Sequence, residues 1–354
     1  MQPTIVGLSV VVLLMAACCQ DTAAQFAQCT GGESCVDIRD CAKFGPHYDE
    51  PAKWSAALRL EFPTKVCKRE WISGGNKYKV CCQRPNDGRK RGLALLDLEG
   101  CGPYTEDRIA FGQDAKLFQY PWMALLMTRE SEFLCGGTLI ADRYVLTAAH
   151  CFKERNIAKV RLGEFDLSKP IDCDKRGELC ADPPQDIAVE QAITHEDYSS
   201  RRKVNDIALI RLAKNAVLND NVHPICLPVN AAMSTKQSLY FVAGWGTTEN
   251  NMPSNKLLFT KLNLLPNSEC KTRLQPFERD IQLYGTQMCA MGLNLTDNCT
   301  GDSGGPLKSI SINARYVQYG IVSYGLRTCG RSSAPGVYTR VENYIDWILQ
   351  HLEE

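Results

Sequence analysis

Cysteine content constrains what this chain can fold into more than any other feature. The sequence of 354 residues holds 18 cysteines. Disulfides form and persist in oxidising compartments, whereas a reducing cytosol gives a protein little reason to carry so many cysteines. We therefore expect a disulfide-bonded, extracellular protein.

An apolar run near the N-terminus agrees with an extracellular destination. It covers residues 5–17, which is too short to span a bilayer but typical of a signal-peptide core, and small residues follow it as cleavage sites. We predict a signal peptide over residues 1–24, with a bacterial lipid anchor through Cys18 as the alternative. No other stretch has eighteen consecutive apolar residues, so we expect a secreted chain with no membrane partner.

The remaining cysteines indicate a small N-terminal domain. Removing Cys18 and Cys19 with the leader leaves sixteen, an even number that eight disulfides would use completely. Six fall in a segment with few large aliphatic residues, where a unit of about 55 residues needs covalent cross-links: Cys29, Cys35, Cys41, Cys67, Cys81 and Cys82. We predict a domain over residues 28–83. Spacing alone leaves fifteen disulfide pairings open.

The segment that follows is polar and rich in turn-forming residues between positions 84 and 92, so we interpret residues 84–108 as a linker. From about residue 109 to 354, short β-type runs such as 208–212 and 316–324 are punctuated by Gly and Pro, as expected for antiparallel barrels. A C-terminal helix is predicted by the i, i+3, i+4 spacing of apolar residues: Val341, Tyr344, Ile345, Ile348, Leu349 and Leu352.

Charge and composition exclude several classes of function. The 40 Lys and Arg residues balance 40 Asp and Glu residues, so no long-range field favours nucleic acid or an anionic membrane surface. A composition that is 44% hydrophobic and 23% charged is typical of a globular protein and not of a disordered one.

Three short motifs carry the candidate chemistry. His150 ends the run Thr-Ala-Ala-His, Asp206 stands immediately before an apolar strand, and Ser303 lies among glycines. Each motif alone is weak, because a His beside a Cys is more often structural, an Asp before a strand usually caps a turn, and a glycine-rich stretch can be a plain loop. The spacing Gly301-x-Ser303-x-Gly305 even matches the nucleophile elbow of α/β-hydrolases.

The order of the motifs separates these interpretations. An α/β-hydrolase needs Ser, then Asp, then His, whereas here the order is His150, Asp206, Ser303, as in the chymotrypsin-like barrel enzymes. Residues 109–354 resemble a complete chymotrypsin-family serine protease, with further matches at residues 244–246, 335–338 and in the C-terminal helix. The resemblance implies an all-β fold of two six-stranded antiparallel barrels with a C-terminal helix.

The resemblance also implies the catalytic roles. Ser303 would attack the scissile carbonyl, His150 would take and return the proton, and Asp206 would orient the imidazole. The backbone N–H groups of Gly301 and Ser303 would form the oxyanion hole. We expect no cofactor for catalysis.

Substrate preference follows from the family position of the pocket base, six residues before the nucleophile. This residue is Asp297, which implies cleavage after Arg or Lys, because a buried acid favours a cationic partner; a solvated loop acid is the alternative. Asn298 and Tyr324 depart from the usual family residues and could shift the Arg/Lys ratio. The expected pocket walls are Ser323, Gly325 and Gly336.

Activation is implied by the same resemblance. Cleavage after Arg108 by an upstream trypsin-like protease would free the amino group of Ile109 to pair with the buried Asp302 carboxylate. Residues 110–111 depart from the usual sequence, and the second basic stretch at 89–91 has no Ile at the matching place.

Family position also implies disulfides. In the large domain they are Cys101–Cys226, which would tether the N-terminal piece after cleavage, Cys135–Cys151, Cys270–Cys289 and Cys299–Cys329, and a small loop would be closed by Cys173 and Cys180.

The six-cysteine module resembles a clip domain, the regulatory module of arthropod cascade proteases, which implies the pairs Cys29–Cys81, Cys35–Cys67 and Cys41–Cys82. The additional small loop is similar to the easter-like, prophenoloxidase-activating subgroup. These resemblances imply a haemolymph enzyme of innate immunity, acting in melanisation or Toll-ligand processing. Its partners would be cascade zymogens or a cytokine precursor, and a serpin inhibitor.

Two further features give weaker predictions. Glu164, Asp166 and Asp172 lie where the family can bind calcium, although a plain acidic loop explains them as well. Asn294 begins an N-glycosylation sequon. Zinc is not expected, since the remaining histidines show no ligand spacing.

Two other functions are alternatives to an active protease. A clip-bearing adaptor without catalysis would typically lack the serine, whereas His150, Asp206 and Ser303 are all present. A digestive trypsin has no evident use for the long cysteine-rich pro-region.

Overall fold

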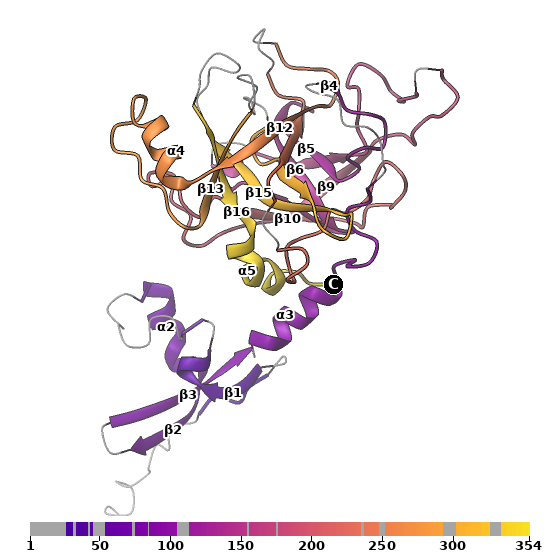
Figure 1. The fold of residues 1–354 in the computed structure, drawn as a ribbon. Helices are drawn as coiled ribbons and strands as arrows, with labels where there is room; N and C mark the ends of the chain where they lie inside the picture. The colour runs from indigo at the N-terminus through magenta and orange to yellow at the C-terminus, as the bar shows by residue number, and fades with distance from the viewer. Residues whose placement is uncertain are drawn as a thin grey trace, which may run out of the picture. The chain divides into compact units, whose positions relative to one another are not determined.

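The chain divides into two compact units, Met1–Gly88 and Arg89–Glu354 (Figure 1). The computed structural model describes residues 26–30, 33–41, 43–44, 54–72, 75–83, 85–104, 113–153, 156–174, 176–234, 237–247, 252–292, 302–325 and 334–354. The predicted signal peptide, residues 1–24, lies outside the described residues. Among those residues, none of the helices is long and apolar enough to cross a membrane.

The N-terminal unit is a three-stranded antiparallel sheet held by disulfides. Strands β1 (Glu33–Asp37), β3 (Gly75–Gln83) and β2 (Val66–Ile72) lie in that order, and helices η1 (Ile38–Asp40) and α2 (Ala56–Lys65) complete the unit. The Ser55 hydroxyl caps α2 by accepting the N–H of Leu58 at 3.2 Å. The small core is largely aromatic, with ring contacts among Phe44, Trp54 and Phe62.

Three disulfides cross this small unit and join the same cysteines that the clip-domain resemblance implied: Cys29–Cys81, Cys35–Cys67 and Cys41–Cys82. The antiparallel register places Cys35 opposite Cys81, so neighbouring cysteines on β1 and β3 serve different bridges. A core this small explains why the unit depends on cross-links.

The larger unit begins with a closed antiparallel barrel of six strands in the order β10-β7-β6-β5-β8-β9. These strands are β5 (Met123–Met127), β6 (Phe133–Ala141), β7 (Tyr144–Thr147), β8 (Lys159–Leu162), β9 (Gln185–Thr194) and β10 (Ala208–Leu212). The inward positions are apolar, and β5 is buried along its whole length.

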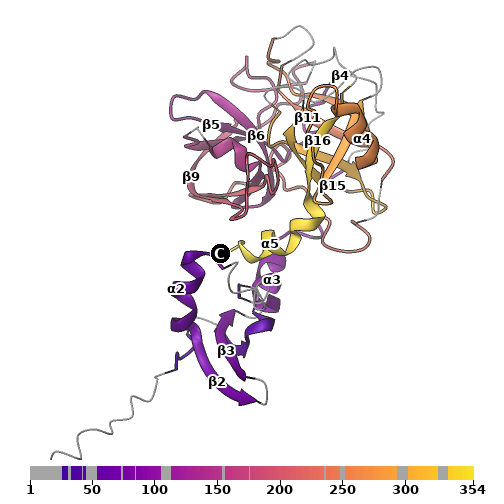
Figure 2. The same cartoon turned by 90° about the vertical axis from the view of Figure 1, so that its left-hand side faces the viewer.

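A second ring follows in the order β11-β14-β15-β16-β13-β12 and is closed by pairing of β11 with β12. Its strands are β11 (Tyr240–Gly244), β12 (Leu258–Leu265), β13 (Gln287–Gly292), β14 (Pro306–Ile310), β15 (Tyr316–Tyr324) and β16 (Gly336–Arg340). The short β4 (Gln113–Asp114) adds to β12, and α4 (Asn267–Leu274) precedes β13. Figure 2 shows β5, β6 and β9 grouped apart from β11, β15 and β16. The predicted fold of two six-stranded barrels is confirmed.

One apolar cluster joins the two barrels. It contains Trp122 and Leu209 from the first barrel and its entry, and Phe241 and Tyr316 from the second, all nearly inaccessible to solvent. Helices η6 (Val341–Tyr344) and α5 (Ile345–Gln350) add their buried face to this cluster, so the predicted C-terminal helix is present in two segments.

The sequence predicted a turn-rich linker after residue 84, but the structure has helix α3 (Pro85–Ala94) at its start. Proline is tolerated in the first turn of a helix, where its missing N–H loses no bond, and Arg and Lys favour helix. Contacts with α5 also favour the helix. Arg89 pairs with Asp346 of α5 at 2.7 Å, and Gly92 lies so close to α5 that a Cβ would stand 2.0 Å from the Leu349 carbonyl oxygen.

Four disulfides lie among the described residues of the larger unit, between the cysteines that family position implied: Cys101–Cys226, Cys135–Cys151, Cys173–Cys180 and Cys270–Cys289. Cys299 and Cys329 lie outside the described residues. Backbone bonds also hold the segment after α3 to this unit, since Gly102 N–H donates to Pro224 O at 2.8 Å and Tyr316 N–H donates to Gly102 O at 2.9 Å.

Candidate active site

The first barrel brings His150 and Asp206 together through strand register. His150 lies in η4 (Ala149–Phe152), just after β7, and Asp206 lies just before β10. Because β7 and β10 are antiparallel, with Thr147 opposite Ala208, the end of one strand meets the start of the other. Two residues 56 positions apart in the chain therefore become neighbours.

The contact between them is a pair of hydrogen bonds. His150 Nδ1 lies 2.8 Å from Asp206 Oδ2, and the backbone N–H of His150 donates to Asp206 Oδ1 at 2.9 Å. Asp206 is buried, whereas the His150 side chain is 29% exposed. In the neutral imidazole that donates from Nδ1 to this carboxylate, Nε2 is the acceptor.

Two residues of the second barrel fix the acid. The Ser323 hydroxyl donates to Asp206 Oδ2 at 2.5 Å, and the Thr339 hydroxyl donates to the Asp206 carbonyl at 2.8 Å. Ser323 was predicted as a wall of the specificity pocket, and its bond to Asp206 was not anticipated. Thr339 was missed altogether, because nothing in its local sequence marks it.

Asn205 also lies at this site and was not predicted. Its backbone has φ 54°, a left-handed conformation that Asn adopts more readily than most residues. Its Nδ2 donates to Asp197 O at 3.0 Å, and its Oδ1 accepts the Tyr344 hydroxyl at 2.7 Å. The turn that presents Asp206 is thus tied to two other segments. The sequence feature that could have identified this residue is its position directly before Asp206.

The Ser303 loop packs against the first barrel. The backbone N–H of Gly136 on β6 donates to Ser303 O at 2.8 Å. Gly304 has φ +82°, and a Cβ there would lie 2.2 Å from the Thr147 hydroxyl oxygen and 2.5 Å from Gly136 O. Glycine is therefore required for the serine loop to reach β6 and β7, the strand that leads to His150.

Asp302, the acid next to Ser303, points toward the Gly-Trp-Gly segment. Its Oδ1 accepts the N–H of Gly246 at 2.9 Å. A Cβ at Gly244 or Gly246 would lie 2.0 or 2.6 Å from that oxygen. These two glycines leave the space that the carboxylate fills.

Part of the predicted specificity pocket is described. Gly325 and Gly336 face each other, since a Cβ on Gly325 would lie 3.8 Å from the Gly336 Cα. Tyr324 directly precedes Gly325, and the Nζ of Lys203 lies 4.5 Å from the centre of the tyrosine ring. Outside the described residues are the predicted Arg108, Ile109, Asn294, Asp297, Asn298 and Gly301.

The predicted calcium ligands converge on one turn of backbone. Glu164 Oε1 and Asp172 Oδ2 both accept the N–H of Phe165, at 3.0 and 3.2 Å, and Asp172 Oδ2 also accepts the N–H of Asp166 at 3.1 Å. Burial raises the pKa of Glu164 and of Asp172, and neighbouring acids act in the same direction.

The donor chemistry of this turn suits a hard cation, because carboxylate oxygens are the ligands that calcium prefers. The three carboxylates nevertheless do not gather oxygens within 4.8 Å of one another in the described structure. Among the described residues, the Glu164 and Asp172 carboxylates accept backbone N–H groups of this turn.

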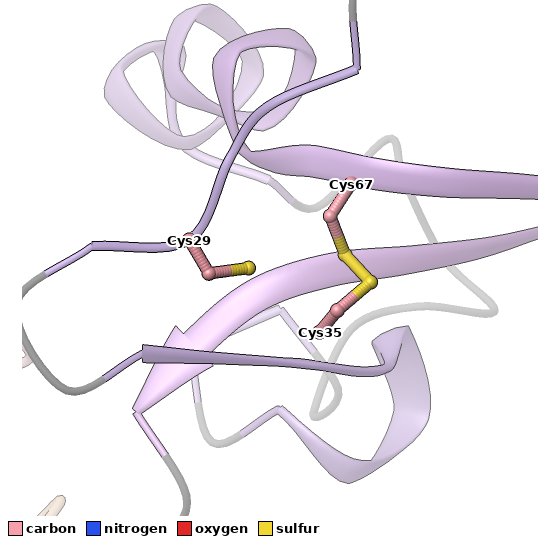
Figure 3. Close-up of side chains that lie close together, drawn as sticks. All are labelled: Cys29, Cys35 and Cys67. Atoms are coloured by element: carbon pink, nitrogen blue, oxygen red, sulfur yellow. A yellow bond between two sulfur atoms is a disulfide. The ribbon is translucent and has the colours of Figure 1, made fainter.

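Cysteines form the two groupings in which three metal-type ligand atoms lie within 4.8 Å among the described residues. Cys29, Cys35 and Cys67 form one group (Figure 3), and Cys135, His150 and Cys151 form the other. Every one of these sulfurs belongs to a disulfide. No thiolate is available at either place to bind a metal.

Comparison with known proteins agrees with this geometry. The family model described as Trypsin matches residues 109–348. The chain is 41% identical over 332 residues to Serine protease grass of Drosophila melanogaster, covering 89% of this chain and 87% of that protein. It is 38% identical over 361 residues to Phenoloxidase-activating factor 3 of Holotrichia diomphalia, covering 98% and 99%.

A solved structure matches over the same length. The crystal structure of the Drosophila Grass clip serine protease of the Toll pathway aligns with a TM-score of 0.67 and 32% identity, covering 92% of this chain and 97% of that one. The match includes both the disulfide-bonded N-terminal unit and the barrels. The chain therefore belongs to the trypsin family and, within it, to the clip-domain serine proteases.

Proposed function

We propose that the chain is the precursor of a secreted serine endopeptidase that cleaves protein substrates after Arg or Lys in an extracellular innate-immune cascade. The observation that carries the proposal is the buried Asp206 carboxylate bonded to His150 by both side chain and backbone, at 2.8 and 2.9 Å. This pair lies in the family's chain order with Ser303, whose loop is bonded to the neighbouring strand β6.

The proposed reaction is acyl transfer through Ser303. Its Oγ attacks the scissile carbonyl while His150 Nε2 accepts the hydroxyl proton, and Asp206 stabilises the imidazolium that forms. The N–H groups of Gly301 and Ser303 bind the developing oxyanion. His150 then donates the proton to the departing amine, and water hydrolyses the acyl-enzyme by the same route in reverse.

Substrate preference is assigned to Asp297. A carboxylate at the base of the pocket attracts a cationic side chain, and guanidinium can bind it with two parallel hydrogen bonds. The facing glycines Gly325 and Gly336 support this assignment, because they leave room for a long side chain.

Activation is assigned to cleavage after Arg108 by a trypsin-like protease. The new amino group of Ile109 would pair with Asp302, whose carboxylate lies against Gly244 and Gly246. The disulfide Cys101–Cys226 would keep the N-terminal piece attached. A serpin would end the activity.

The physiological setting is inferred from the relatives. Phenoloxidase-activating factor 3 and Grass of the Toll pathway both match across nearly the whole chain, which favours a zymogen of melanisation or a Toll cytokine precursor as substrate. Seven disulfides among the described residues suit an oxidising extracellular fluid such as haemolymph. Glycosylation at Asn294 and calcium at Glu164, Asp166 and Asp172 remain part of this proposal.

The decisive experiment is amidase activity before and after cleavage at Arg108, measured on Arg, Lys and Phe chromogenic peptides. We expect activity on Arg and Lys peptides to appear only after cleavage and to vanish in Ser303→Ala. A preference for Phe would mean that Asp297 is not the pocket base. Complete silence after verified cleavage would favour the non-catalytic adaptor.

A further inference from the structure

A basic tripeptide stands where the larger unit begins. Arg89, Lys90 and Arg91 follow directly after Gly88, the last residue of the N-terminal unit. They lie within α3, and all three residues are exposed to solvent. A trypsin-like protease, which the proposed activation after Arg108 requires, recognises the same side chains at this tripeptide. The chain therefore presents two basic sites to one kind of protease.

The two sites differ in what a cut would separate. The disulfide Cys101–Cys226 ties the segment between them to the larger unit, so a cut after Arg108 leaves the N-terminal unit attached. No disulfide among the described residues joins a residue before position 89 to one after position 91. A cut at residues 89–91 would therefore end the covalent link between the two units.

An ion pair holds the tripeptide at its first residue. Arg89 Nε lies 2.7 Å from Oδ1 of Asp346 on α5. Both side chains are exposed in part, 44% for Arg89 and 73% for Asp346, so the pair is reached by solvent and is of moderate strength.

Packing holds the residues that follow the tripeptide. Gly92 is buried, and a Cβ there would lie 2.0 Å from the Leu349 carbonyl oxygen of α5. The next leucines belong to, or pack against, the apolar cluster that joins the barrels: Leu93, Leu95, Leu96 and Leu98. The chain on the C-terminal side of the tripeptide is thus fixed to the larger unit.

These contacts oppose proteolysis. A helix must unwind before a protease can bind the chain around the cleaved bond, and here the unwound segment must also leave α5. When opening and closing are fast, the rate of cleavage follows the population of the open form. The exposed basic side chains are therefore visible to a protease, whereas the peptide bonds between them are withheld while α3 is docked.

We propose that the bonds after Arg89, Lys90 and Arg91 form a second, latent processing site for a trypsin-like protease, which the docking of α3 on α5 keeps closed. Hydrolysis after Arg91 breaks the bond between its carbonyl carbon and the Gly92 nitrogen. Water supplies the hydroxyl of the new carboxyl group and the proton of the new amino group.

The state of α3 thus decides the product of processing. With α3 docked, the protease is directed to Arg108 and the enzyme keeps its N-terminal unit; with α3 displaced, the larger unit is freed. This inference goes beyond the proposed function and takes from it only the cleavage after Arg108.

The test uses the full-length chain with Ser303→Ala, which prevents self-digestion, and added trypsin. Products are followed by gel electrophoresis without reductant and by mass spectrometry of the intact fragments. A cut at 89–91 should release a fragment with the six N-terminal cysteines without reductant. A cut after Arg108 alone should separate the pieces only when reductant is added. The variant Arg108→Gln isolates the first event.

Charge reversal at α5 should open the site. Asp346→Lys replaces the attraction to Arg89 with repulsion and leaves the tripeptide unchanged, so cleavage at 89–91 should speed up by about 2- to 30-fold. Glu342→Lys is the matched control, because Glu342 is an exposed acid on the preceding helical segment whose ion pair is with Arg340. It should be cut as slowly as the parent.

A charge swap separates docking from general destabilisation. Arg89→Glu combined with Asp346→Lys restores an ion pair of opposite sense and keeps Lys90 and Arg91 as cleavable residues. This double variant should be cut about 2- to 30-fold more slowly than Arg89→Glu alone, although both have the same sequence at the cleaved bonds.

An unfolded reference completes the test. A synthetic peptide with the sequence of residues 84–97 should be cut at least about 10-fold faster than the full chain, because it has no α5 to dock on. Equal rates for peptide and chain would overturn the proposal, as would equal rates for the parent and Asp346→Lys or a charge swap that fails to protect. An N-terminal unit that stays joined without reductant after a verified cut at 89–91 would overturn the release. A chain that resists cleavage after Arg108 would instead contradict the assigned activation alone.

Discussion

Replacing Asn205 should lower both the stability of the protein and its catalytic rate, because this residue sets the conformation of the turn that carries Asp206. Its φ of 54° is costly for alanine by about 1–2 kcal/mol. Its two side-chain hydrogen bonds, at 2.7 and 3.0 Å, each contribute about 0.5–1.5 kcal/mol. Asn205→Ala should therefore lower the free energy of unfolding by about 2–5 kcal/mol.

Two further variants separate these contributions. Asn205→Gly removes the backbone strain and both hydrogen bonds but makes the unfolded chain more flexible, so it should be about 0.5–1 kcal/mol more stable than Asn205→Ala. Tyr344→Phe removes the bond at 2.7 Å but leaves the Asn205 bond to Asp197 in place, and loss of the bond to Asn205 should cost about 0.5–1.5 kcal/mol. The Tyr344 hydroxyl also interacts with Thr286, and that contact is lost in the same variant.

The stability assay is urea unfolding of Ser303→Ala precursors with disulfides intact, followed by tryptophan fluorescence. The activity assay is kcat/KM of the cleaved enzymes on an Arg peptide. A small displacement of a catalytic group can cost about 100-fold in rate, so Asn205→Ala should lose about 10- to 100-fold, mainly in kcat. An Asn205→Ala protein within about 0.5 kcal/mol of its parent, or more stable than Asn205→Gly, would refute this reasoning.

Three other changes test separate parts of the structure. Gly304→Ala should abolish activity on the Arg peptide while Arg108 is still cleaved, because its Cβ would lie 2.2 Å from the Thr147 hydroxyl oxygen; near-parent kcat/KM would contradict the close approach. In EDTA, Asp172→Asn should raise the melting temperature at pH 7.5 but not at pH 4. Burial raises the pKa of Asp172, so its contribution to stability is lost as pH rises through the folded value. If the turn binds calcium, added calcium should make the melting temperature of the parent higher than that of Asp172→Asn. An unchanged order of the two melting temperatures would count against a calcium site. Gly92→Ala should loosen α3 from α5 and speed trypsin cleavage at residues 89–91, since its Cβ would meet the Leu349 carbonyl oxygen at 2.0 Å; an unchanged cleavage rate would argue against that packing.

Sequence alone determined the fold class, the order His150, Asp206, Ser303 and the cysteine framework. Each of these features can be recognised from a short stretch of sequence: strands from their apolar pattern, motifs from their residue spacing, and cysteines from their positions. The family resemblance then supplied pairings, such as Cys101–Cys226, that spacing could not.

Only the tertiary structure decided which groups hold the site together. Ser323 and Thr339 bond to Asp206 across 117 and 133 residues of chain. Such contacts depend on strand register and barrel closure, which leave no trace in the neighbouring sequence. Helix α3 is a second case that local sequence does not predict. Its turn-forming residues indicate a linker, whereas its packing against α5 favours a helix. Propensity is worth tenths of a kcal/mol per residue, whereas packing contacts can outweigh it.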